Sequence, residues 1–250
     1  MNTTELAWQA EEACHNAWPA LHQVWCGDWM LRISGGFGRR VNSANPLYAE
    51  AGLADETLAA CQTVYRGQGQ PVIFRVPTLL DPTVDARLDD LGYTAEGETI
   101  TLHADIAAVD TTLDEAVEVL SYPSDDWLAA MKLAQERDDD AQDFFTRIVR
   151  SLMTPVGFAG LRVDDDLVAL AFGALHGDLL GVESVITSEA HRGKGYARQL
   201  LNALFAWAAA AGARGVCLQV EAPNAPAIAL YKGLGLTTEL YRYHYRREPA

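Results

Sequence analysis

Hydrophobic residues repeat with a helical period in some segments of this chain and form short continuous or alternating runs in others, which predicts helices interspersed with strands. In the first part of the chain, Gly35-Gly-Phe-Gly38 has the composition of a hairpin turn. The pattern there predicts a helix over Glu5–Trp18, extended runs over Trp29–Ser34 and Arg39–Ala44, a helix over Asp55–Arg66, a strand over Pro71–Pro77, a helix near Asp81–Leu91 and a strand from Tyr93 towards His103.

After residue 108, three consecutive apolar strands are followed by a long helix. This helix begins at Tyr196, carries apolar residues at 200, 201, 204, 205, 207 and 208, and ends before Gly212. The whole expected series is a strand over Ala116–Leu120, helices over Asp125–Gln135 and Ala141–Leu152, strands over Val156–Val163, Leu167–Leu175 and Leu179–Thr187, a helix over Tyr196–Ala211, a strand over Gly215–Glu221, a helix over Ala225–Leu234 and an extended segment over Leu236–Arg246.

The two halves of the chain end alike. Val72-Ile-Phe-Arg-Val76 parallels Val216-Cys-Leu-Gln-Val220, and after a helix Leu91-Gly-Tyr-Thr94 parallels Leu234-Gly-Leu-Thr237. Such a repeat indicates a duplication, with one domain over residues 1–108 and a second over 109–250. The alternative is a single domain that carries an unrelated N-terminal extension.

Composition and charge narrow the class of protein. Hydrophobic residues make up 49% of the chain and charged residues 21%, and no stretch approaches the roughly 18 apolar residues of a membrane helix. The N-terminus lacks the features of a secretory signal, so we expect a cytoplasmic protein without a membrane partner. The net charge of -15 disfavours nucleic acid as a partner. The four cysteines have irregular spacing without a C-x-x-C pair, which argues against a metal site or a disulfide framework.

One glycine-rich turn has the features of a phosphate-binding site. Arg192-Gly-Lys-Gly-Tyr-Ala197 lies between an apolar strand and the long helix, where free amides and the helix dipole favour an anion. Small residues at 193, 195 and 197 let a pyrophosphate approach the backbone, and basic residues gather beside them. A Walker A motif would need Ser or Thr after Lys194, and a dinucleotide fold would place its glycines after the first strand.

This turn and the segments around it resemble the GNAT superfamily of N-acetyltransferases. The resemblance covers roughly residues 155–240, including Asn224 and the stretch Ala227-Ile-Ala-Leu-Tyr-Lys-Gly-Leu-Gly-Leu236. It implies an α+β fold with helices layered on the sheet and acetyl-CoA as co-substrate. We expect two GNAT-like domains, each with a mixed, mostly antiparallel sheet flanked by helices. The first half has no Arg-x-x-Gly-x-Gly/Ala turn between strand and helix, so we expect it to be a degenerate copy without a pyrophosphate loop.

The resemblance also implies which residues bind the cofactor. The strand before the turn would diverge from its parallel neighbour and offer its backbone at Val185 to Thr187 to the pantetheine arm. Asn224 matches a cofactor-binding asparagine, and it is also a good helix N-cap. Tyr231 matches the tyrosine that faces the departing sulfur, although it could instead be a core aromatic. The predicted cofactor-binding set is Val185, Ile186, Thr187, Arg192, Gly193, Lys194, Gly195, Tyr196, Ala197 and Asn224.

Glu183 is the best candidate for the general base. It interrupts an apolar strand and has the parity of Val185 and Thr187, so we expect it to face the same side of the sheet. A buried carboxyl group without a cation favours its neutral form and can take up a proton near neutral pH. The sequence equally allows an arginine to pair with it. His176 is a weaker candidate because a Gly-Asp turn follows it.

The acceptor is open between a small molecule and a peptide, and we expect a primary amine to attack acetyl-CoA directly. Asp138, Asp139 and Asp140 are interpreted as a solvated link between helices. Candidates for one wall of the acceptor cleft come from the first half, namely Trp29, Arg32, Arg39, Arg40 and Asn42. The rival hypothesis is a protein that binds acyl-CoA as a sensor or interaction module without catalysis. The oligomeric state is left open.

Overall fold

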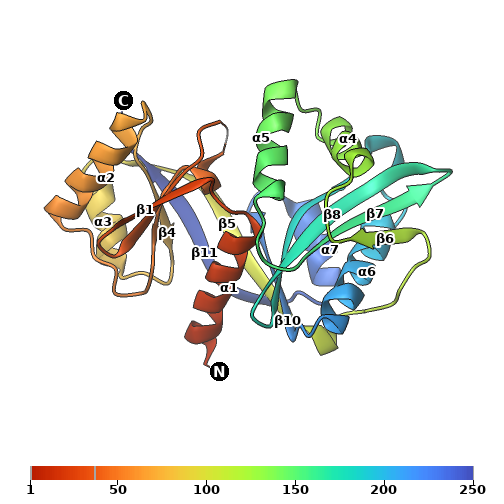
Figure 1. Ribbon diagram of the computed structural model, residues 1–250. Helices are drawn as coiled ribbons and strands as arrows, with labels where there is room; N and C mark the ends of the chain where they lie inside the picture. Colours follow the sequence, from red (N-terminus) through yellow and green to blue (C-terminus); the bar gives the residue numbers. More distant parts are fainter. Residues whose placement is uncertain (1, 37, 250) are drawn as a thin grey trace.

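The computed structural model describes residues 2–36 and 38–249 (Figure 1). Its strands are β1 (His22–Cys26), β2 (Trp29–Ile33), β3 (Ala44–Pro46), β4 (Ile73–Pro77), β5 (Thr94–Asp105), β6 (Val117–Leu120), β7 (Val156–Val163), β8 (Asp166–His176), β9 (Leu179–Thr187), β10 (Gly215–Glu221) and β11 (Thr238–Arg247). Its α-helices are α1 (Thr3–Ala17), α2 (Asp55–Gly67), α3 (Pro82–Asp90), α4 (Asp125–Ala134), α5 (Asp139–Arg150), α6 (Tyr196–Ala210) and α7 (Ala225–Gly233). The α+β class and the mixed sheet flanked by helices are confirmed.

All the strands belong to one sheet, in the order β1-β2-β3-β4-β11-β5-β10-β9-β8-β7-β6. Two neighbouring pairs are parallel, β3 with β4 and β9 with β10, and the others are antiparallel. The sheet expected in each half is therefore continuous with that of the other half.

The two halves exchange their last strands at the centre of this sheet. The C-terminal strand β11 lies between β4 and β5 of the first half, and β5 lies between β11 and β10. Figure 1 shows the blue β11 beside the orange and yellow strands of the first half. Without β11, the first half would lack the strand between β4 and β5, and without β5, the second half would lack the strand between β10 and β11.

The repeat in the sequence corresponds to a repeat in the structure. β4 and β10 each pair in parallel with the strand before them, and each is followed by a short helix and a strand in the middle of the sheet. Both helices end in the same hydrogen-bonded cap, in which Tyr93 N donates to Leu88 O and Leu236 N donates to Tyr231 O. These caps place Leu88 at the position that Tyr231 has in the second half.

The helices cover both faces of the sheet. Successive residues of β10 point to opposite faces of the sheet. Cys217 packs with α1, whereas Val216 and Leu218 pack with α6 and α7. Helices α2 and α3 pack on the same face as α6 and α7, while α4 and α5 lie on the face of α1. All four cysteines are free thiols.

Helix α1 is held on the sheet by a buried polar network. The Glu11 carboxylate accepts hydrogen bonds from Arg75 Nη2 of β4 at 2.7 Å and from the Tyr241 hydroxyl of β11. Glu11 and Arg75 are 2% and 1% exposed, so each charge needs the other. The Arg75 guanidinium also lies 3.4 Å from the centroid of the Tyr243 ring. Helix α1 thereby contacts strands of both halves.

The structure differs from the expected elements mainly in the first half. Strand β1 is not among the expected strands, because its residues are mostly exposed and give no apolar pattern. Arg39–Val41 form a single 3-10 turn instead of an extended run, and β2 pairs with Ala44–Pro46. Phe37, inside the predicted Gly35–Gly38 turn, lies outside the described residues.

Candidate functional site

The glycine turn leaves a row of free amides at the N-terminus of α6. The amides of residues 193–197 donate no hydrogen bond to any other residue that the structure describes. Gly193 and Gly195 have φ of 75° and 85°, a left-handed conformation that residues with a side chain adopt at a cost. Gly195 is also the N-cap, so no side chain caps these amides. Five free amides and the positive end of the helix dipole therefore lie together at this end of α6, which favours a bound anion.

Strand β9 bends just before this turn. Ser184 has φ of 53°, and the pairing with β8 gains one residue on β9 between the pairs Phe172–Glu183 and Leu170–Ile186. This is a β-bulge, which twists and redirects a strand. Pairing with β10 stops at Val182, so Val185 to Thr187 lie beyond the paired stretch. Their backbone edge diverges from β10.

Because of this bulge, the expectation that Glu183 faces the same side of the sheet as Val185 is wrong. Val185 packs against the core under α6, whereas Ile186 packs with the aromatic cluster under α4 and α5. Glu183 instead lies on the face of α1, where its neighbour Gly181 meets Ala13 and Ala17. The extra residue at the bulge reverses the alternation, so Glu183 and Val185 face opposite sides.

A cavity of about 730 Å³ joins the glycine turn to the divergent edge of β9. The predicted cofactor-binding residues line it except Lys194, which is exposed. Asn224 caps α7 by accepting a hydrogen bond from Ala227 N at 3.2 Å, so its capping role is confirmed while it also lines the cavity. The lining residues are Val185, Ile186, Thr187, His191, Arg192, Gly193, Gly195, Tyr196, Ala197, Arg198, Asn224, Pro226, Ala227, Leu230 and Tyr231.

Tyr231 of α7 also lines this cavity. Tyr231 is 9% exposed, and no residue that the structure describes forms a hydrogen bond with its hydroxyl. Burial, with a smaller contribution from the negative charge of Glu183, raises the pKa of Tyr231 to about 12. The phenol is therefore protonated at neutral pH and free to donate a hydrogen bond into the cavity.

Glu183 is paired with an arginine from the first half. Arg40 Nη1 and Nη2 donate to the two carboxylate oxygens of Glu183 at 2.9 and 2.5 Å. Burial alone would lower the pKa of Arg40, but the Glu183 carboxylate outweighs it and holds that pKa well above its usual range. The alternative of an arginine partner is therefore correct, and the premise of a carboxyl group without a cation is wrong.

A second cavity, of about 440 Å³, lies on the α1 face of the sheet and is lined from both halves. Glu183 and Ser184 line it, while the next residues of β9 line the first cavity, so the two cavities adjoin at the bulge. Sequence reasoning identified Arg39 and Arg40 here but not the aromatic and amide groups. The lining residues are Trp18, Gly38, Arg39, Arg40, Thr99, Gln135, Arg137, Glu183, Ser184, Gln219, Glu221, Tyr243 and Tyr245.

Three of the residues suggested for the acceptor wall serve the first half instead. Trp29 is fully buried in the core and donates from Nε1 to Gly52 O at 2.8 Å. Arg32 is 1% exposed and donates to His15 Nδ1 and to backbone carbonyls. Asn42 accepts from Ser34 N and Gly35 N and thus fixes the loop around it.

The remaining candidates lie at helix ends and turns. His176 contacts Asn16 and Glu12 of α1, outside both cavities. Asp138 is the N-cap of α5, and Asp139 forms an ion pair with Lys132. Asp140 is exposed.

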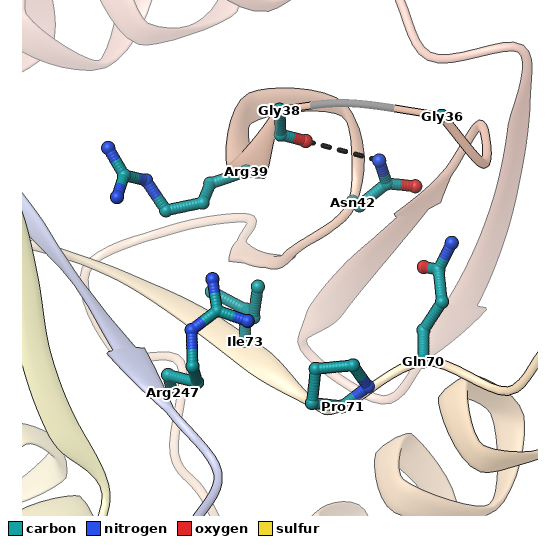
Figure 2. A pocket seen from close by; sticks show the side chains of 8 residues that line it. All are labelled: Gly36, Gly38, Arg39, Asn42, Gln70, Pro71, Ile73 and Arg247. Carbon is teal, nitrogen blue, oxygen red and sulfur yellow. Dashed lines mark hydrogen bonds between the residues drawn. The ribbon is translucent and has the colours of Figure 1, made fainter.

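A third hollow, of about 420 Å³, lies between the Gly36–Asn42 loop and the start of β4 (Figure 2). The Arg39 and Arg247 side chains lie on one side of it and Gln70 on the other. Both arginines contact Glu96, Arg247 at 2.8 Å and Arg39 at 3.7 Å. Their charges are therefore balanced within the protein.

Within residues 2–36 and 38–249, no cluster of three or more His, Cys, Asp or Glu side chains could hold a metal ion. The helices of this part of the chain are too short or too polar to span a membrane.

Several known proteins resemble this chain over most of its length. The family model described as "Probable histone acetyltransferase Rv0428c C-terminal" matches residues 4–246. The uncharacterized N-acetyltransferase YobR of Bacillus subtilis is 25% identical over 92% of this chain and 94% of its own. A GCN5-related N-acetyltransferase from Kribbella flavida has a TM-score of 0.73 at 15% identity, covering 99% and 96% of the two chains. A tandem GNAT protein from the clavulanic acid biosynthesis pathway has a TM-score of 0.64 at 15% identity, over 89% and 79%.

Proposed function

This chain belongs to the Rv0428c C-terminal family of probable histone acetyltransferases, within the GNAT superfamily of acetyl-CoA-dependent N-acetyltransferases, and we propose that only its second half performs the transfer. The acceptor is a primary amine of a small molecule or peptide, and it attacks the thioester directly. The observation that carries this proposal is that the turn with five free amides and the buried Tyr231 line the same cavity.

The first half lacks the groups that such a site needs. The pairs Ala44–Phe74 and Val182–Leu218 are equivalent, so Asn45 corresponds to Glu183. Asn45 is fully buried and donates to Ser43 O at 2.6 Å. With Leu88 in place of Tyr231, neither side-chain chemistry is repeated. These replacements support a degenerate first domain over residues 1–108 and an active second domain over 109–250.

Each ligand has a place in the two adjoining cavities. The pyrophosphate binds the amides of residues 193–197 with Arg192 beside them, and Lys194 adds charge from outside the cavity. The pantetheine arm follows Val185 to Thr187 and brings the thioester next to Tyr231. The acceptor amine enters from the second cavity, beside Glu183.

The transfer requires two proton movements. The amine is uncharged when it attacks the thioester carbon, so an ammonium first loses a proton, to Glu183 directly or through water. As the C–N bond forms and the C–S bond breaks, the sulfur leaves with the bonding electrons and receives a hydrogen bond or a proton from Tyr231. Arg40 fixes the Glu183 carboxylate at the bulge, where the two cavities meet.

Release of CoA from acetyl-CoA across a panel of amines tests this proposal. We expect Tyr231→Phe and Glu183→Gln each to lower kcat by about 10²-fold, with acetyl-CoA affinity retained. The control variants Tyr122→Phe and Glu118→Gln change exposed residues outside both cavities and should match the wild type. Unchanged rates in the two site variants would remove those residues from the chemistry. Binding of acetyl-CoA without CoA release for any amine would favour a sensor.

A further inference from the structure

We propose that the acceptor carries an anionic group, a carboxylate or a phosphate, in addition to its reactive amine, and that Arg137 binds this group. The inference rests on the proposed function, because it assigns the second cavity to the acceptor. It makes the substrate a zwitterionic amine rather than a polycationic one.

Among the described residues, Arg137 is the arginine of the second cavity that has no carboxylate partner. The other two arginines that line it have carboxylate partners, since Arg40 pairs with Glu183 and Arg39 contacts Glu96 and Glu221. Among the residues that the structure describes, Arg137 forms no ion pair, and its polar contact is a long one of 3.5 Å to Gln142 Oε1. In a protein of net charge -15, a half-buried arginine without a carboxylate leaves room for an anion from outside.

The position of Arg137 is fixed by the end of α4. Glu136 has φ of 51°, its amide donates to Leu133 O at 3.2 Å, and the Arg137 amide donates to Lys132 O at 3.1 Å. This is a Schellman cap, whose last residue commonly makes an apolar contact with the helix. Here that residue is an arginine whose side chain turns to the cavity, so the cap holds the guanidinium in place.

Phe145 of α5 supports the guanidinium from one side. The Arg137 Cζ lies 3.7 Å from the centroid of the Phe145 ring, which restricts the side chain without neutralising it. Burial lowers the pKa of Arg137 to about 10, so it is still charged at neutral pH. A stacked guanidinium with unused donors is suited to two parallel hydrogen bonds with a carboxylate or phosphate.

The groups that can hold the amine end of the acceptor lie in the same cavity. Glu183 and Glu221 line it together with the aromatic side chains of Trp18, Tyr243 and Tyr245. Glu183 and Glu221 balance Arg40 and Arg39, so Arg137 supplies the excess positive charge that attracts an anionic group, while the aromatic faces are suited to the ammonium. Such an arrangement orients an amine that carries both charges and disfavours a second cation near Arg137.

Matched acceptor pairs test the inference. Amino acids are compared with their carboxamides, and phosphoethanolamine with ethanolamine, in the acetyl-CoA assay with wild type, Arg137→Gln and Arg150→Gln. Arg150 is the control because it removes the same charge from the exposed end of α5, outside the cavity. The two kinds of pair separate a carboxylate from a phosphate, and diamines provide the polycationic comparison.

We expect wild type and Arg150→Gln to favour the anionic member of at least one pair by about tenfold or more in kcat/KM. Arg137→Gln should abolish this preference, and the loss should appear as a higher KM for the anionic member of the pair. An unchanged preference in Arg137→Gln, a wild-type preference for neutral amines or diamines, or no turnover of any anionic amine despite acetyl-CoA binding would overturn the inference. If the wild type does not bind acetyl-CoA, that result would instead contradict the proposed function.

Discussion

At the scale of single residues, the proposed cofactor site depends on backbone conformation more than on side chains. A Cβ added at Gly193 or Gly195 would meet open space, so no neighbouring atom excludes alanine there. Positive φ is what favours glycine, and it aims successive amides at one anion.

We predict that Gly193→Ala and Gly195→Ala each weaken acetyl-CoA binding by about tenfold, because the strained residue turns its amide away from the pyrophosphate. Calorimetric titration with acetyl-CoA measures this change. Gly212→Ala is a matched control, since Gly212 has φ of 97° and open space around its Cβ at the far end of α6. All three variants should lose roughly 1 kcal/mol of stability, but only the first two should lose affinity. Equal affinity in all three would contradict the site.

At the scale of elements, helix α1 connects the two halves through groups that must keep fixed protonation states. Burial lowers the pKa of His15 to about 4, so the ring is neutral in the folded protein. Burial alone would raise the pKa of Glu11, but the positive charge of Arg75 outweighs it and holds this pKa well below its usual range. Both groups therefore bind protons less readily in the folded protein than in the unfolded chain.

We predict that the free energy of unfolding decreases as the pH falls from about 6.5 to about 4, because the unfolded chain protonates His15 first. The shift corresponds to roughly 3 kcal/mol, and Glu11 extends the loss below pH 4.5. Urea unfolding at several pH values measures it. His15→Gln should reduce the slope between pH 6.5 and 4, whereas the exposed His22→Gln should not. An identical slope in both variants would contradict this role of His15.

At the scale of the whole molecule, the exchange of β5 and β11 makes the two halves one folding unit. β11 pairs with β4 and β5, and the second cavity takes residues from β5, β9, β10 and β11. A disturbance in the core of the first half should therefore reach the site in the second half.

We predict that Phe74→Ala, in the core of the first half, lowers the stability of the entire chain by about 3–5 kcal/mol in a single transition. Differential scanning calorimetry should show equal calorimetric and van't Hoff enthalpies in wild type and variant. Two separate transitions, with only one displaced, would show that the halves unfold independently.

The sequence alone determined the α+β class, most of the helices and strands, the glycine turn and the repeat that relates the halves. These features depend on local periodicity, turn chemistry and residue order, which a linear pattern contains. Only the tertiary structure decided that Glu183 pairs with Arg40, that the bulge at Ser184 reverses the alternation of side chains along β9, and that Arg137 lines the second cavity. These facts depend on contacts between residues far apart in the chain and on one extra residue in a strand, neither of which leaves a local signal.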